Sequence, residues 1–188
     1  MPKRSLYFIA ILPPSEIGEQ ITLLRTECAE RFDSRQALKS PPHITLQQPF
    51  MLRTEDKIVF EKALAILFEK FKAFNVVLKN FECFSGKHNP VIFIKPLEND
   101  LMNILHYNLM LFLRNLGFDE KITRLAFHPH ITIAYRDLSN KNFKRAWIEF
   151  EERIFNAAFT VNTVYLMCHD RKTWQPVKSF VLEEGGAA

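Results

Sequence analysis

The sequence contains two copies of a short pattern built from one histidine and one threonine. Residues 43–46 read His-Ile-Thr-Leu, residues 130–133 read His-Ile-Thr-Ile, and a proline precedes each copy. Histidine changes protonation near neutral pH, so two histidines in matching settings can serve as a general acid and a general base. A threonine hydroxyl beside each histidine can donate a hydrogen bond to an anionic oxygen. The repeat therefore predicts a proton-transfer site for an anion that needs no metal or other cofactor.

Both copies are expected on β-strands, where successive side chains point to opposite faces. His43 and Thr45 would then share one face, and His130 and Thr132 would share another. The same alternation places Arg136 on the face of His130 and Thr132. If the two strands face one cleft, the chemistry that suits them is phosphoryl transfer at a phosphodiester or a cyclic phosphate, because the hydroxyls can stabilise the charge that develops on the phosphate oxygens.

Charge and composition are compatible with this chemistry. The chain of 188 residues has a net charge of +4 and a pI of about 9.0. Cations are concentrated around the second pattern, where residues 121–145 hold six lysines and arginines against a single aspartate. A mildly basic chain can attract an anionic ligand, although a solvated basic surface would have the same composition.

Several classes of protein are not indicated. The three cysteines form no Cys-x-x-Cys pair, so neither a disulfide framework nor a zinc knuckle is expected. The apolar run over residues 6–12 ends at Pro13 and Pro14 with no small-residue cleavage site, so no signal peptide is expected, and no stretch is long enough to span a membrane. We therefore expect a monomeric, cytoplasmic protein with no membrane partner, formed by a single domain over residues 1–188.

The spacing of apolar residues predicts strands and helices in mixed order. Strands are expected at residues 6–12, 43–47, 74–84, 91–95, 126–135, 161–168 and 177–182. Helices are expected from an N-cap at Ser15 to about Phe32, from an N-cap at Thr54 to about Lys72, over 99–116 with Gly117 just beyond, and over 140–152. This order predicts an α+β fold with two pseudo-symmetric lobes of mainly antiparallel sheet, outer helices, and one His-x-Thr-x strand in each lobe.

The two His-x-Thr-x motifs, with their prolines and separation, resemble those of the 2H phosphoesterase superfamily, and especially its 2′-5′ RNA ligase-like, or RNA 2′,3′-cyclic phosphodiesterase, branch. The resemblance extends over about residues 5–183 and implies a bilobal fold around a central cleft. It implies metal-independent hydrolysis of 2′,3′-cyclic phosphate ends of RNA or nucleotides. By the same resemblance, His43 is the general acid, His130 is the general base, and Thr45 and Thr132 bind the phosphate.

Other residues are candidates for contacts with the substrate. Members of the family often carry an arginine just after the second motif, whereas Tyr135 stands there in this chain and Arg136 follows it. Both are therefore candidate substrate-binding residues. Tyr135, Phe50 and Trp174 could each stack on a nucleobase.

Two other functions remain open. The same cleft could belong to a non-catalytic module that binds RNA ends or nucleotides. His128 and His130 form a His-x-His pair that, together with His43, could instead ligate the metal of a metallohydrolase. His106 is expected on the exposed surface of its helix.

Overall fold

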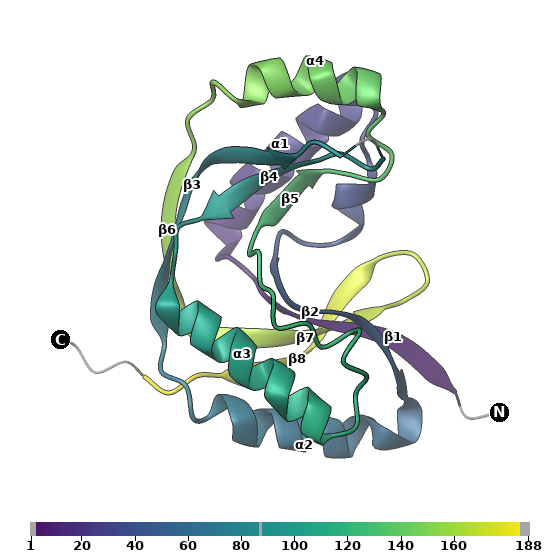
Figure 1. Cartoon of the computed structure of the whole chain (residues 1–188), viewed down its shortest axis with the longest axis vertical. Coiled ribbons are helices and arrows are strands. Elements are labelled where there is room, and N and C mark those ends of the chain that lie inside the picture. The colour runs from purple at the N-terminus through teal and green to yellow at the C-terminus, as the bar shows by residue number, and fades with distance from the viewer. Residues whose placement is uncertain (1–2, 87, 185–188) are drawn as a thin grey trace.

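Two four-stranded antiparallel sheets form the framework of the computed structural model, which describes residues 3–86 and 88–184 (Figure 1). The first sheet has the strand order β2 (Ile44–Arg53), β1 (Arg4–Ile11), β7 (Thr163–His169) and β8 (Trp174–Val181). The second has the order β5 (Ile131–Ala134), β4 (Val91–Pro96), β3 (Phe74–Phe84) and β6 (Asn156–Val161). Neighbouring strands are antiparallel throughout, which confirms the predicted α+β class.

Helices cover the outer side of each sheet (Figure 1). Helices α1 (Ser15–Phe32) and α4 (Asn140–Phe150) pack against each other and against β5 and β4, whereas α2 (Lys57–Phe68) packs on β8 and α3 (Asp100–Asn115) packs on β2. Two short 3-10 helices, η1 (Gln36–Lys39) and η2 (Thr54–Asp56), lie in the connections. Since α1 follows a strand of the first sheet but covers the second, and α3 does the reverse, the two lobes are interleaved along the chain.

Helix α3 has the ends that its sequence predicts. The side chain of Asn99 accepts a hydrogen bond from the backbone N–H of Met102 at 2.9 Å, and Gly117 has a positive φ of 86° just past the helix. The predicted N-caps of the first two helices are wrong. Ser15 already lies inside α1, and Thr54 begins η2 rather than α2; neither makes a capping hydrogen bond.

The strands also differ from expectation in their lengths and in one additional strand. Strand β2 is longer than predicted, because it continues to Arg53, whereas β5 is limited to four residues. Strand β6 was not expected, since only Phe159 and Val161 of its six residues are buried. The hairpin of β3 and β4 belongs to the sheet of β5, and the hairpin of β7 and β8 belongs to the sheet of β2. Each sheet thus carries one motif strand, and that strand lies at its edge.

Strand β1 divides the buried residues into two groups. Ile9 and Ile11 point into the large core, which extends through both sheets. On the opposite face, Phe8 and Ala10 form a small separate cluster with Met167. This small cluster lies beside the first His-x-Thr-x motif. No helix in the described part of the chain is long and apolar enough to cross a membrane.

Candidate active site

The two motif histidines have the same position and the same hydrogen bond. His43 directly precedes β2 and His130 directly precedes β5. The Nδ1 atom of His43 lies 2.7 Å from the carbonyl oxygen of Pro41, and that of His130 lies 2.7 Å from the carbonyl oxygen of His128. A carbonyl oxygen can only accept, so Nδ1 carries the proton in both rings. Each Nε2 is therefore left free to accept or donate a proton.

An aromatic side chain from the neighbouring strand supports each imidazole. Phe8 of β1 packs on His43 with ring centroids 4.8 Å apart, and Phe93 of β4 packs on His130 at 5.2 Å. Phe84 also contacts the ring of His130 edge-on at 5.5 Å. These contacts restrict the rotation of each ring, so that the Nδ1 hydrogen bond and the packing together define the direction of Nε2.

The pKa values of both histidines are below the ordinary range. Burial is the main cause, and it lowers the pKa of His43 to about 4; the hydrogen bond to Pro41 opposes the shift, and the charges of Arg25 and His130 add to it. Burial also lowers the pKa of His130. The influence of one imidazole on the other means that the two motifs lie close together. Without a bound anion, both rings are neutral near pH 7.

The threonines lie as strand alternation predicts. Thr45 and Thr132 are half-buried, and each stands between buried apolar neighbours. No side-chain hydrogen bond of either hydroxyl occurs within residues 3–86 and 88–184, so both can donate to a ligand. Thr45 and His130, which come from different sheets, line the same cavity of about 390 Å³. The first threonine and the second histidine thus face one space.

A buried arginine that sequence reasoning did not single out joins the two motifs. The side chain of Arg25 in α1 is 1% exposed; its Nε donates to the carbonyl oxygen of Thr132 at 2.9 Å. Its Nη1 donates to the carbonyl oxygens of Ala37 at 3.0 Å and Ser40 at 2.8 Å, just before the first motif. One guanidinium therefore fixes backbone on both sides of the site. No carboxylate in the described part of the chain pairs with it, and burial lowers its pKa to about 10.

A signal for Arg25 was present in the sequence. It follows Ile21 by four residues and precedes Cys28 by three, and both are fully buried residues of the same helix. Helical spacing therefore places a cation within the apolar face of α1. A cation in that position needs hydrogen-bond acceptors, although the sequence does not say which atoms supply them.

The structure separates Tyr135 and Arg136 from the strand that precedes them. Strand β5 ends at Ala134, and Arg136 is exposed with a φ of 58°, so alternation does not place it on the face of His130; that geometric prediction is wrong. Its guanidinium lies 5.2 Å from the ring of Tyr135. Tyr135 is half-buried and is near enough to Arg25 to influence its pKa. Neither residue lines the cavity of Thr45 and His130.

Of the residues considered for base stacking, Phe50 is unavailable. It is 3% exposed and packs against Tyr7, Phe60 and Phe118 in the core. Trp174 is half-buried against Phe8, with ring centroids 4.6 Å apart.

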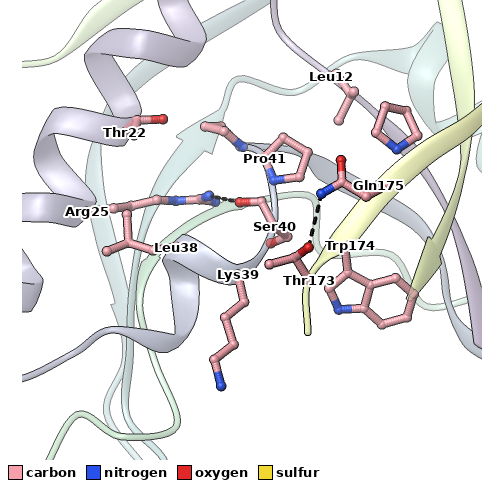
Figure 2. Close-up of a pocket in the computed structure, with 12 residues that line it drawn as sticks. Leu12, Thr22, Arg25, Leu38, Lys39, Ser40, Pro41, Thr173, Trp174 and Gln175 are labelled. Atoms are coloured by element: carbon pink, nitrogen blue, oxygen red, sulfur yellow. Dashed lines mark hydrogen bonds between the residues drawn. The ribbon is translucent and has the colours of Figure 1, made fainter. Parts of the chain in front are cut away.

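Trp174 also lines a second cavity, of about 350 Å³, shown in Figure 2. Arg25 reaches Ser40 on one side of this cavity, while Thr173 and Gln175 of the β7–β8 hairpin lie opposite. The cavity adjoins the prolines of the first motif and contains neither motif histidine in its lining. It is therefore a neighbour of the site rather than its centre.

The histidines of the described residues do not assemble a metal centre. No three histidine, cysteine, aspartate or glutamate side chains of residues 3–86 and 88–184 come together in the way that metal ligands do. His128, His130 and His43 thus do not form the set that a metallohydrolase needs. The expectation for His106 was wrong, since it is 4% exposed and its ring stacks on Phe127 at 4.1 Å.

Known proteins are similar to this chain in sequence and in fold. Two relatives named "Putative phosphoesterase", from Geobacillus kaustophilus and Bacillus cytotoxicus, are each 27% identical to this chain over 177 and 178 residues. The matches cover 94% of this chain and 95% and 96% of those proteins. The region of similarity to these two proteins therefore includes both motifs.

Solved structures agree at the level of the fold. LigT of E. coli in its apo form superposes with a TM-score of 0.66 at 19% identity, covering 96% of this chain and 99% of LigT. TT0787 of Thermus thermophilus superposes with a TM-score of 0.67 at 18% identity, covering 96% and 100%. Residues 13–173 match the family model described as the 2′-5′ RNA ligase superfamily. With that match over most of its length, the chain belongs to the 2′-5′ RNA ligase superfamily of 2H phosphoesterases.

Proposed function

We propose that this protein hydrolyses 2′,3′-cyclic phosphate ends of RNA or nucleotides without a metal ion. The observation that carries the proposal is the matched pair of histidines, each with Nδ1 held by a backbone carbonyl at 2.7 Å and with Nε2 free. A pair of oriented, mutually close imidazoles is what acid–base catalysis of phosphoryl transfer requires.

In the proposed reaction, Nε2 of His130 takes a proton from a water molecule whose oxygen attacks the phosphorus. His43 takes a proton from solvent at Nε2 when the anionic substrate binds; the bond from phosphorus to the 2′ or 3′ oxygen then breaks, and Nε2 of His43 donates this proton to that oxygen. The products are a phosphomonoester and a free hydroxyl, and proton exchange with solvent restores both imidazoles. The hydroxyls of Thr45 and Thr132 donate to the non-bridging oxygens as negative charge develops there.

The electrostatics of the site favour an anion. Arg25 contributes a buried positive charge, and its pKa of about 10 keeps it protonated at neutral pH. The lowered pKa of His43 leaves its Nε2 without a proton near pH 7 until a phosphate binds nearby. A bound anion favours the protonated imidazole, so the substrate itself raises the pKa of the acid.

Related structures support a nucleotide as the ligand. LigT of E. coli has been crystallised with 3′-AMP and, separately, with phosphate, at TM-scores of 0.66 and 0.55 to this chain. Its complexes with ATP and NADP+ have the same overall fold. These ligands are those of LigT, and we extend them here to a ribonucleotide with a cyclic phosphate as the substrate of this chain.

The test is turnover of 2′,3′-cyclic mononucleotides and short RNAs ending in a cyclic phosphate, in buffer with excess chelator. We expect hydrolysis by the native protein, and a loss of at least about 1,000-fold in kcat for His43→Ala and for His130→Ala. Binding of 3′-nucleotides that survives in both variants would show that the variants are folded. Binding without turnover by the native protein would instead support the nucleotide-binding module.

An aryl phosphodiester separates the roles of the two histidines. A nitrophenolate leaving group departs without a proton, so the variant that lacks the general acid should recover activity on this substrate. We expect recovery for His43→Ala and none for His130→Ala. The opposite pattern would reverse the assignment of acid and base.

A further inference from the structure

The cavity that Thr45 and His130 line also carries a cation at its opening. Arg124 lines the same cavity, of about 390 Å³, and is itself exposed, so it lies where the cavity meets solvent. Apolar side chains, among them Met110 and Phe127, form other parts of the wall. Sites for small organic ligands combine such walls with a few well-placed polar groups. A phosphate beside Thr45 and His130 would fill only part of this space.

The guanidinium of Arg124 has donors that the protein does not use. Its Nε donates to the carbonyl oxygen of Lys121 at 3.2 Å. Neither of its Nη atoms makes a hydrogen bond or an ion pair within residues 3–86 and 88–184. A guanidinium binds phosphate through two parallel N–H bonds, so the edge formed by the two Nη atoms can bind such an anion.

The carboxylates nearest in sequence are directed at other groups. Asp137, the single anion of residues 121–145, accepts hydrogen bonds from the backbone N–H groups at the start of η1, at 2.8 and 3.2 Å. Asp119 accepts one from a backbone N–H of its own loop at 2.7 Å, and Glu120 lies 3.8 Å from an arginine of α3. Since none of these three carboxylates pairs with Arg124, its charge is available to a ligand.

The loop that carries Arg124 is held in place by buried groups. Thr123 is fully buried, and its carbonyl oxygen accepts a hydrogen bond from a side chain of α3 at 2.7 Å. The carbonyl oxygen of Ile122 accepts from Nε2 of Gln47 at 3.0 Å. Because Gln47 follows Thr45 by two residues in β2, this bond ties the loop to the first motif strand. The backbone of Arg124 is thus positioned before a ligand binds, which reduces the entropy that binding costs.

We propose that Arg124 binds a second phosphate of the substrate, the one on the 5′ oxygen of the nucleotide whose cyclic phosphate lies at Thr45 and His130. The inference rests on the proposed function, which places the cyclic phosphate there. The terminal nucleotide of an RNA has one other anionic group, its 5′ phosphate, and the rest of the chain continues from it. A cation at the opening of the cavity suits that group, because the chain can leave towards solvent.

The substrate class that follows has two phosphates on one ribose. A nucleoside 2′,3′-cyclic phosphate without a 5′ phosphate would leave the Nη atoms of Arg124 unpaired, whereas its 5′-phosphorylated counterpart would use both ends of the site. Hydrogen bonds between charged groups contribute more than neutral ones, so the two ligands should differ measurably. The selectivity would be for the second phosphate and not for the base.

The test compares adenosine 2′,3′-cyclic phosphate with and without a 5′ phosphate. We would measure kcat/KM for both, and Kd for adenosine 3′,5′-bisphosphate against 3′-AMP by calorimetry. We expect the native protein to favour the doubly phosphorylated partner about ten-fold or more in each pair, and Arg124→Met to reduce both ratios to near one. Arg145 is exposed on α4 and does not line the cavity, so Arg145→Met removes the same charge and should leave the ratios unchanged.

Each ratio is measured within one protein preparation, so a partly unfolded variant does not distort it. Equal use of the two partners by the native protein would overturn the inference, as would a preference that persists in Arg124→Met or falls equally in Arg145→Met. The calorimetric ratio separates these outcomes from a failure of the proposed function. Selective binding of the bisphosphate without any turnover would support the role of Arg124 and reject the hydrolase, whereas turnover without selectivity would do the reverse.

Discussion

At the scale of single side chains, binding of the phosphate is expected to depend on Thr45 and Thr132. Both are half-buried between buried apolar neighbours, so valine can replace either without loss of strand propensity or volume. We expect Thr45→Val and Thr132→Val each to lower kcat/KM for a cyclic nucleotide by about 100-fold, because one donor to the developing charge is lost. Serine at either position keeps the hydroxyl and should retain most of the activity. A valine variant within about three-fold of the native protein would contradict the proposed role.

The candidate functional residues that could be predicted from the sequence differ from those that could not in how local their evidence is. His43, Thr45, His130 and Thr132 belong to short patterns, and alternation along a strand is enough to predict that each pair shares one face. Arg25 acts on the carbonyl of Thr132, which is 107 residues away, so no local pattern describes that contact.

At the scale of elements, Arg25 connects α1 with the backbone that carries each motif. Arg25→Met would leave the carbonyls of Thr132, Ala37 and Ser40 without this donor, and we expect the free energy of unfolding to fall by about 2–4 kcal/mol. Removing the charge would also raise the pKa of His43, because that charge lowers it in the native protein. Denaturant titration and the pH dependence of kcat/KM measure the two effects.

Arg25→Lys distinguishes charge from geometry. Lysine keeps the positive charge but cannot reproduce hydrogen bonds from Nε and Nη1 at once. We expect the pH profile of this variant to match that of the native protein while kcat falls. The exposed Arg31 lies on the same helix, and Arg31→Met should change neither the pH profile nor kcat. An unshifted pH profile in Arg25→Met would show that its charge does not act on His43.

Elements themselves were predicted more reliably than their partners. The bounds of α1 and β3 agree with the spacing of their apolar residues, because that spacing reflects one buried face of a single element. The pairing of the β3–β4 hairpin with β5 depends on contacts between distant segments. The interleaving of the lobes was therefore beyond what periodicity could indicate, although two similar lobes were expected.

At the scale of the whole molecule, buried neutral histidines make stability depend on pH. Burial lowers the pKa of His106 to about 4, and the pKa of His43 is also lowered to about 4, whereas an unfolded histidine titrates near 6.5. Between these values the unfolded chain binds protons that the native protein does not bind. The free energy of unfolding is therefore unaffected above about pH 7 and falls as the pH decreases from about 6.5 to about 4.

His106 offers the clearest measurement of this effect, because it is 4% exposed and no charged partner contributes to its shift. We expect His106 alone to account for a loss of about 3 kcal/mol between pH 7 and pH 4. His106→Phe keeps a ring stacked on Phe127 but cannot titrate. Between pH 7 and pH 4 the unfolding free energy of this variant should therefore fall by about 3 kcal/mol less than that of the native protein. Parallel pH curves for the native protein and His106→Phe would mean that His106 becomes protonated without unfolding, which its burial against Phe127 should prevent.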